Sequence, residues 1–190
     1  MKKLALLISL VLSVSAFATD YTITGGYYGT KIYHNNDTLL MTGGGVNSLT
    51  AEDYSVLDIR NTSPFAAGSG GIGTLDLEDS SRLGFSGGQL NWFDIDDYAT
   101  AALSGGKINK LENDSQGGYA SVEIICKEYS YNSQTKKLTG IWGNDSAFNI
   151  QLADLAGYVP TYNILEFTII PEPTTLLLLG LGGMLIRKSN

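Results

Sequence analysis

The chain has little of four residue types that build chemical sites: one cysteine, one histidine and twelve lysines and arginines together in 190 residues. The lone Cys126 permits no internal disulfide, so stability has to come from packing or cations. It alternates with Val122 and Ile124, which predicts a buried core position. His34 has no cysteine or second histidine with which to share a metal, and we expect it on a surface turn.

The same scarcity argues against two function classes. No Ser/His/Asp or Cys/His arrangement can be built from one histidine, and the few cations leave little to bind substrate beside a carboxylate pair. We therefore expect no enzyme. Between residues 19 and 170 lie eight of the twelve basic and eighteen of the nineteen acidic residues, a net charge of −10. This charge disfavours nucleic acid as a partner.

The N-terminus has the order of a secretory signal peptide. Lys2 and Lys3 precede an apolar run over 4–14, and Ala16 and Ala18 form a small-residue cleavage pattern. A transmembrane helix is the weaker alternative, because the run is short and stops on small residues. We expect export through the Sec machinery and cleavage after Ala18.

The C-terminus is typical of a membrane-retained tail, with a rigid polar tripeptide, a short apolar segment and a basic stop. These parts are Pro171, Glu172 and Pro173, then residues 174–186, then Arg187 and Lys188. A helix over 174–186 would rise roughly 20 Å against about 30 Å of hydrocarbon. It would be a marginal anchor; the alternative is a buried terminal element of the domain.

This tail resembles the PEP-CTERM sorting signal in its Pro-Glu-Pro, its apolar stretch with Gly180, Gly182 and Gly183, and its final Arg187 and Lys188. The resemblance implies recognition by a membrane-embedded exosortase that cuts near the Pro-Glu-Pro. The chain would then be a substrate, held transiently at the inner membrane and afterwards at the cell surface or outside. The basic cluster and the apolar run are shorter than in the fullest form of the signal.

A repeat occupies the middle of the chain. Its anchor, Ser or Thr followed by Gly-Gly, begins at Thr24, Thr42, Ser69, Ser86 and Ser104, with spacings of 18, 27, 17 and 18. Apolar positions recur in phase after the anchors, among them Tyr54 and Tyr98, and steps of two between them indicate strands. We predict a β-solenoid, a parallel β-helix of about four to five coils with a loop over 60–68. The alternative is a β-sandwich of antiparallel strands.

Longer alternating strands begin at Tyr119. The pattern predicts a hairpin over 120–142 and strands over 148–152 and 164–170, which we interpret as an antiparallel cap on the open end of the solenoid. The expected domain organisation is a signal peptide over 1–18, the Gly-Gly-repeat solenoid over 19–118, the β-rich cap over 119–170 and the sorting signal with its transmembrane segment over 171–190.

Acidic pairs occupy the second turn of three units. Of these, Glu78 and Asp79 would lie about 5 Å from Asp96 and Asp97 on the neighbouring coil. Such carboxylates suit Ca²⁺, which would relieve their repulsion. The alternative is that Asp and Glu are solvated turn residues with no cofactor bound.

Two functions remain open. The first is an exported, non-catalytic surface or extracellular-matrix protein, of the kind that builds a biofilm. The second is a secreted carbohydrate-binding or polysaccharide-degrading β-helix protein with extracellular polysaccharide as its partner. Tyrosines, Trp92 and Trp142 would then be sugar-stacking platforms, although each can equally be packing.

Overall fold

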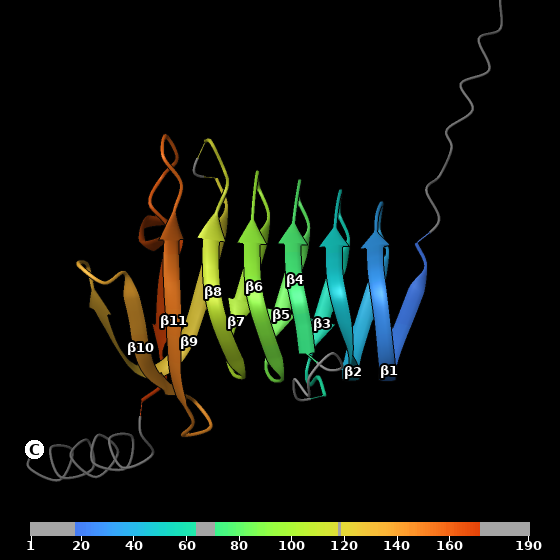
Figure 1. Ribbon diagram of the computed structural model, residues 1–190, viewed down its shortest axis with the longest axis horizontal. Helices are drawn as coiled ribbons and strands as arrows, with labels where there is room; N and C mark the ends of the chain where they lie inside the picture. Colours follow the sequence, from blue (N-terminus) through green and yellow to red (C-terminus); the bar gives the residue numbers. More distant parts are fainter. Residues whose placement is uncertain (1–17, 64–70, 118, 172–190) are drawn as a thin grey trace, which may run out of the picture.

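The structure, a computed structural model, describes residues 18–63, 71–117 and 119–171 (Figure 1). Its regular elements are twelve β-strands and one short 3-10 turn, η1 (Thr161–Ile164). The fold is therefore all-β, as the alternation of apolar residues predicts.

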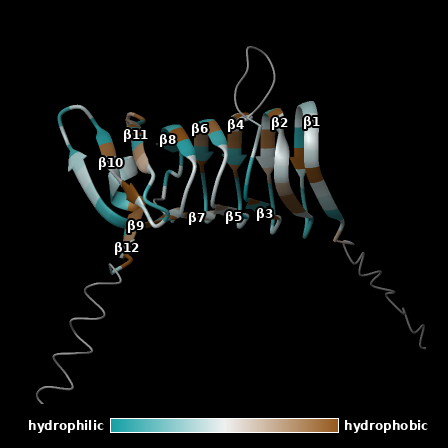
Figure 2. Cartoon of the chain, turned by 90° about the horizontal axis from the view of Figure 1, so that it is seen from below, coloured by the Kyte–Doolittle hydropathy of each residue, from teal (hydrophilic) through white to brown (hydrophobic). Residues whose placement is uncertain are grey.

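The strands form two rows that face each other (Figures 1 and 2). The front row contains the second halves of β1 (Asp20–Tyr33) and β2 (Thr38–Ala51), then β4 (Gly71–Leu77), β6 (Gln89–Ile95), β8 (Lys107–Asn113) and β11 (Ala147–Asp154). The back row contains the first halves of β1 and β2, then β3 (Val56–Ile59), β5 (Arg82–Phe85), β7 (Thr100–Leu103), β9 (Ser121–Asn132) and β12 (Leu165–Ile169). We call one back strand with the front strand that follows it a coil.

Neighbouring strands within each row are parallel, and their register follows the sequence repeat. Leu75 lies beside Phe93, and Phe93 beside Leu111, each eighteen positions further along the chain. Between β2 and β4 the offset rises to twenty-six, with Leu49 beside Leu75. The added residues belong to the predicted loop between β3 and β4, of which 64–70 fall outside the described residues.

The C-terminal strands differ from the prediction. The hairpin of β9 and β10 (Lys137–Trp142) is present, but β9 also pairs in parallel with β7, and β11 pairs in parallel with β8. Because β10 joins β9 to β11 and β2 joins β3 to β4, ten strands close into a hydrogen-bonded ring. The prediction of an open solenoid with a separate antiparallel cap is therefore wrong, and the parallel rows also contradict an antiparallel sandwich.

The core fills the space between the two rows. Leu75, Phe93 and Leu111 are fully buried in the front row, and Cys126 is fully buried in the back row, which confirms its predicted core position. Burial raises the pKa of the Cys126 thiol, so the neutral form predominates. His34 is exposed beside the first turn, as predicted, with its Nδ1 3.5 Å from a carboxylate oxygen of Glu52.

The Gly-Gly anchors form the corner between a back strand and the next front strand, and their two glycines have different roles. The second adopts a positive φ, as at Gly106 with 79°, where an L side chain is strained. The first allows adjacent coils to approach: a Cβ on Gly105 would lie 2.3 Å from the carbonyl oxygen of Ser86. The predicted glycine turn is confirmed.

The first coil is built differently from the others on its inward positions. Where β2 has inward aliphatic side chains or alanine, the register partners on β1 are three tyrosines and a lysine: Tyr21, Tyr28, Tyr33 and Lys31. The rings of Tyr21 and Tyr33 meet edge to face at 5.0 Å, and Lys31 Nζ lies 4.9 Å from the centroid of the Tyr28 ring. Tyr33 is buried, and burial raises its pKa to about 12, whereas Tyr21, Tyr28 and Lys31 cover the end of the core with their polar tips near water.

Trp142 ties the hairpin to the coils and is packing rather than a sugar platform. Its side chain is fully buried, with its ring centroid 4.2 Å from that of Phe148, and its Nε1–H donates to the carbonyl of Gly106 at 2.9 Å.

We expect Trp142→Phe to lower the free energy of unfolding by about 2 kcal/mol, because it leaves a cavity and a partly buried carbonyl without a donor. Urea denaturation measures this; Trp92→Phe, at an exposed position, is the control and should change stability by less than about 0.5 kcal/mol.

Candidate functional site

The turns that lead from each front strand into the next back strand form a continuous surface, which we call the turn edge. Its residues Asn35, Asp53, Asp79 and Asp97 stack coil upon coil and all have positive φ, between 50° and 58°. Asn and Asp are the residues other than glycine that adopt this conformation most readily. The backbone therefore explains why the repeat carries an aspartate here.

The aspartates also cap the neighbouring coil. An oxygen of Asp53 accepts the backbone N–H of Asn35 at 2.9 Å, and an oxygen of Asp79 accepts that of Asp53 at 3.0 Å. At the next coil the pattern changes, because the N–H of Asp97 donates to Oδ1 of Asp96 at 2.6 Å. Charged acceptors of this kind strengthen the bonds between coils, so these acids have a structural role whether or not they bind a ligand.

The four carboxylates that we expected to share Ca²⁺ line more than one hollow. Glu78 and Asp96 line one small hollow of about 80 Å³. Asp79 and Asp97 line a different, larger one. In the part of the chain that the structure describes, no group of three or more His, Cys, Asp or Glu side chains is arranged to hold a metal ion.

Ca²⁺ binding stays a prediction that thermal unfolding tests. Because Asp79 and Asp96 each accept a backbone N–H, we expect the melting midpoint to be the same in 5 mM CaCl₂, about 5,000-fold above a micromolar Kd, as in chelator. A midpoint several degrees higher in CaCl₂ would restore the calcium hypothesis. The same pair of scans on Asp97→Asn would then show whether the turn edge holds the ion.

A second acidic strip runs along the outer face of the front row. Asp76, Asp94 and Glu112 occupy the same register position on β4, β6 and β8. Burial, followed by the charges of Asp114, Glu112 and Asp76, raises the pKa of Asp94 to about 7. Lys110 offsets part of this charge: its Nζ is 2.5 Å from Glu112 and 3.5 Å from the centroid of the Trp92 ring.

Tyrosines are sugar-stacking candidates from the sequence, but we did not predict that two of them lie on the turn edge. Tyr54 and Tyr98 stand in phase with the apolar positions of the repeat, yet they are 67% and 59% exposed. Ser80 takes the equivalent place on the coil between them. The signal was available in the sequence, since each of these residues directly follows the aspartate of an acidic pair.

Two hollows flank Tyr98. One, of about 360 Å³, is lined by Asp53, Tyr54, Asp79, Ser80, Asp97 and Tyr98. The other, of about 320 Å³, is lined by Tyr98, Asp96, Asp97, Asp114, Ser115, Gln116, Gly117, Tyr119 and Tyr158. Ring stacking is already used here, because the rings of Tyr98 and Tyr119 lie 4.8 Å apart at 18°. The turn edge thus offers aromatic faces beside carboxylate, hydroxyl and amide groups.

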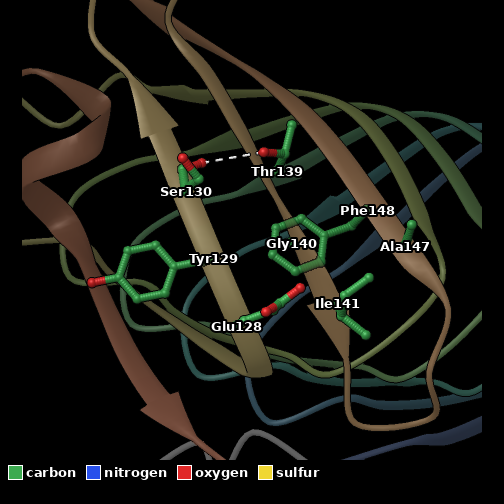
Figure 3. A pocket seen from close by; sticks show the side chains of 8 residues that line it. All are labelled: Glu128, Tyr129, Ser130, Thr139, Gly140, Ile141, Ala147 and Phe148. Atoms are coloured by element: carbon green, nitrogen blue, oxygen red, sulfur yellow. Dashed lines mark hydrogen bonds between the residues drawn. The ribbon is translucent and has the colours of Figure 1, made fainter.

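A further hollow of about 390 Å³ lies over β9, β10 and β11 (Figure 3). Gly140 stands in register between Tyr129 and Phe148 on the adjacent strands, and the Phe148 ring takes the space that a Cβ on Gly140 would occupy, with its nearest atom 2.4 Å away. Thr139 Oγ1 donates to the backbone carbonyl of Ser130 at 3.4 Å along its wall (Figure 3). Glu128 supplies the one carboxylate of its lining, so the hollow lacks the paired acids that glycoside chemistry needs.

The sorting and cleavage residues lie mostly outside the described part of the chain. Ala18 and Pro171 are described, and both are exposed. Ala16, Glu172, Pro173, Arg187 and Lys188 fall outside it, as does the apolar run between them. Within residues 18–63, 71–117 and 119–171, no helix has the length and hydrophobicity needed to cross a membrane.

Comparisons with known proteins found no relative of this chain. The chain matches no family model, no curated protein and no solved structure.

Proposed function

We propose that this chain is an exported, non-catalytic protein of the cell surface or extracellular matrix, sorted through its C-terminus and processed by an exosortase. The observation that carries the proposal is the pairing of a signal-peptide pattern at one end with a tail that resembles the PEP-CTERM signal at the other. The exported part is strongly acidic and has a single, buried cysteine, so its stability outside the cell does not depend on a disulfide.

The architecture supports a durable extracellular module. The parallel rows, with their eighteen-residue register, are closed into a ten-strand ring by β10 and enclose one continuous buried core. β1 and β12 stand at opposite ends of the rows (Figure 2), and the exposed Ala18 and Pro171 adjoin them. Both ends can therefore be cut without opening the core.

Intact-mass measurement of the mature protein from its native host tests the proposal. We expect a chain that starts at Thr19 and ends near Pro171, with the residues after the cut missing. A double variant, Pro171→Ala with Pro173→Ala, should keep the C-terminal tail and stay in the membrane fraction. An unprocessed chain in the cytosol would overturn the proposal; a chain with a cleaved N-terminus and an intact tail would overturn the exosortase step.

The carbohydrate-active alternative divides into two parts. The hollow of Figure 3 has one carboxylate, and Asp53 and Asp79 on the turn edge each accept a backbone N–H, so neither place supplies the paired free carboxylates that cleavage of polysaccharide needs. Binding without cleavage is favoured by the exposed tyrosines of the turn edge. A binding role is compatible with a matrix protein, since matrix proteins function by holding polymer.

A further inference from the structure

We propose that the hollow between Tyr54 and Tyr98, here called the slot, binds one ring of a neutral saccharide. The slot has Ser80 on the coil between the two tyrosines and is lined by Asp53, Asp79 and Asp97. This inference goes beyond the proposed function, and it holds whether or not the ends of the chain are processed.

The width of the slot follows from the coil spacing. The backbone N–H of Ser80 donates to the backbone carbonyl of Asp53, and that of Tyr98 donates to the backbone carbonyl of Asp79, both at 2.8 Å. The three turns are therefore consecutive. Tyr54 and Tyr98 are therefore two strand spacings apart, about 9.6 Å. A ring that contacts an aromatic face on each side at about 3.5–4 Å needs about 7–8 Å. One flat or chair-shaped ring fits, and it replaces the tyrosine that the middle coil lacks.

The polar lining suits a ligand that donates hydrogen bonds. A carboxylate accepts and cannot donate, and those of Asp53 and Asp79 each have one oxygen bonded to a backbone N–H. Asp53, Asp79, Asp97 and Ser80 all line the slot, so carboxylate and hydroxyl oxygens border it on three consecutive coils. Saccharide hydroxyls donate to these oxygens while the C–H faces of the ring stack on the tyrosines.

Charge narrows the class of ligand that the slot can bind. Three carboxylates beside the slot repel anionic sugars, nucleotides and phosphates. These carboxylates, with Asp96 and Asp114 in the hollow beyond Tyr98, would also attract a cation, so the test below includes a cation as a competing ligand. The two hollows share Tyr98 and Asp97, but in the second one the ring of Tyr98 already stacks on Tyr119, so the stacking site for a saccharide ring is the slot itself.

One substitution blocks the slot without removing any group around it. Ser80→Tyr places a ring at the equivalent position to Tyr54 and Tyr98, where the backbone already carries tyrosine on the coils before and after. The variant should fold with an unchanged melting midpoint. The added ring would fill the slot between Tyr54 and Tyr98. Stacking of tyrosines on this edge is already seen at Tyr98 and Tyr119, whose rings lie 4.8 Å apart.

The test is isothermal titration of the purified protein with four uncharged hexasaccharides: cellohexaose, laminarihexaose, maltohexaose and mannohexaose. We expect saturable binding of at least one. Tyr54→Ala and Tyr98→Ala should each weaken it about tenfold, and Ser80→Tyr by at least that factor. Trp92→Ala removes an exposed aromatic ring from the front row and serves as the control, with an unchanged affinity.

Several outcomes would overturn the proposal. These are no binding of any of the four saccharides, full binding by a correctly folded Ser80→Tyr variant, and an equal loss in Trp92→Ala. Binding of tetramethylammonium that Ser80→Tyr abolishes, with no saccharide bound, would show that the slot is a cation site instead.

Discussion

Gly105→Ala is expected to lower the free energy of unfolding by about 3 kcal/mol, near the upper end for an overpacked site. The added Cβ would lie 2.3 Å from the carbonyl oxygen of Ser86 and 3.0 Å from its carbonyl carbon. Both are backbone atoms of the adjacent coil, so no side chain can move aside. Relief requires the two coils to separate, which weakens the ladder between them. Urea denaturation measures the loss.

The first coil supplies the matched control. Gly25 has the same place in its anchor, has no positive φ, and an added Cβ there meets no atom within 4 Å. Gly25→Ala should therefore leave stability within about 0.5 kcal/mol, or raise it slightly by restricting the unfolded chain. Equal losses in the two variants would show that the close approach of coils is not what selects glycine at Gly105.

Asp94→Asn is expected to stabilise the protein at pH 8 by a few kcal/mol, as an order of magnitude. The carboxyl group is shielded from water and faces the charges of Asp114, Glu112 and Asp76, and its pKa is raised to about 7. One of its oxygens is buried without a hydrogen-bond partner among the described residues. The neutral amide keeps the shape and removes the buried charge.

The raised pKa of Asp94 determines whether stability rises or falls with pH. Because the folded state holds the Asp94 proton more tightly than the unfolded state, the folded chain binds more protons between pH about 4 and 7. The contribution of Asp94 to stability is therefore lost as pH rises through that window. Melting midpoints of the natural protein should fall across it, and those of Asp94→Asn should fall less. Asp58→Asn, at an exposed carboxyl that pairs with Arg60, is the control; an equal gain there would contradict burial as the cause.

Several parts of the fold follow from the sequence for a clear physical reason. When coils stack in parallel, equivalent positions touch, so Leu75, Phe93 and Leu111 must all be apolar and small-Gly-Gly must recur at the corner. The closure of the ring does not follow, because local alternation describes β9, β10 and β11 equally well as an isolated hairpin or as members of the rows. Only the long-range pairing of β9 with β7 and of β11 with β8 distinguishes these cases.

The candidate site was only partly predictable. Asp79 and Asp97 were assigned to a turn correctly, and Asn35 at the same register position indicates a left-handed backbone there. Tyr54 and Tyr98 were harder to place, because tyrosine combines an apolar ring with a polar hydroxyl and occurs both in cores and on surfaces. Their exposure depends on the tight turn that projects the residue after each aspartate outward.

The two end strands of the rows, β1 and β12, affect whether copies of the protein can join end to end. Among the described strands, β1 and β12 each pair on one side alone, and they differ in length, with fourteen residues against five. Head-to-tail polymerisation requires complementary edges at both ends of each subunit. β12 is short and is followed closely by Pro171, which lacks a backbone donor, while Lys31 and the tyrosines of β1 keep the opposite edge hydrated. The geometry therefore favours discrete subunits attached to a matrix over filaments that grow by adding copies end to end.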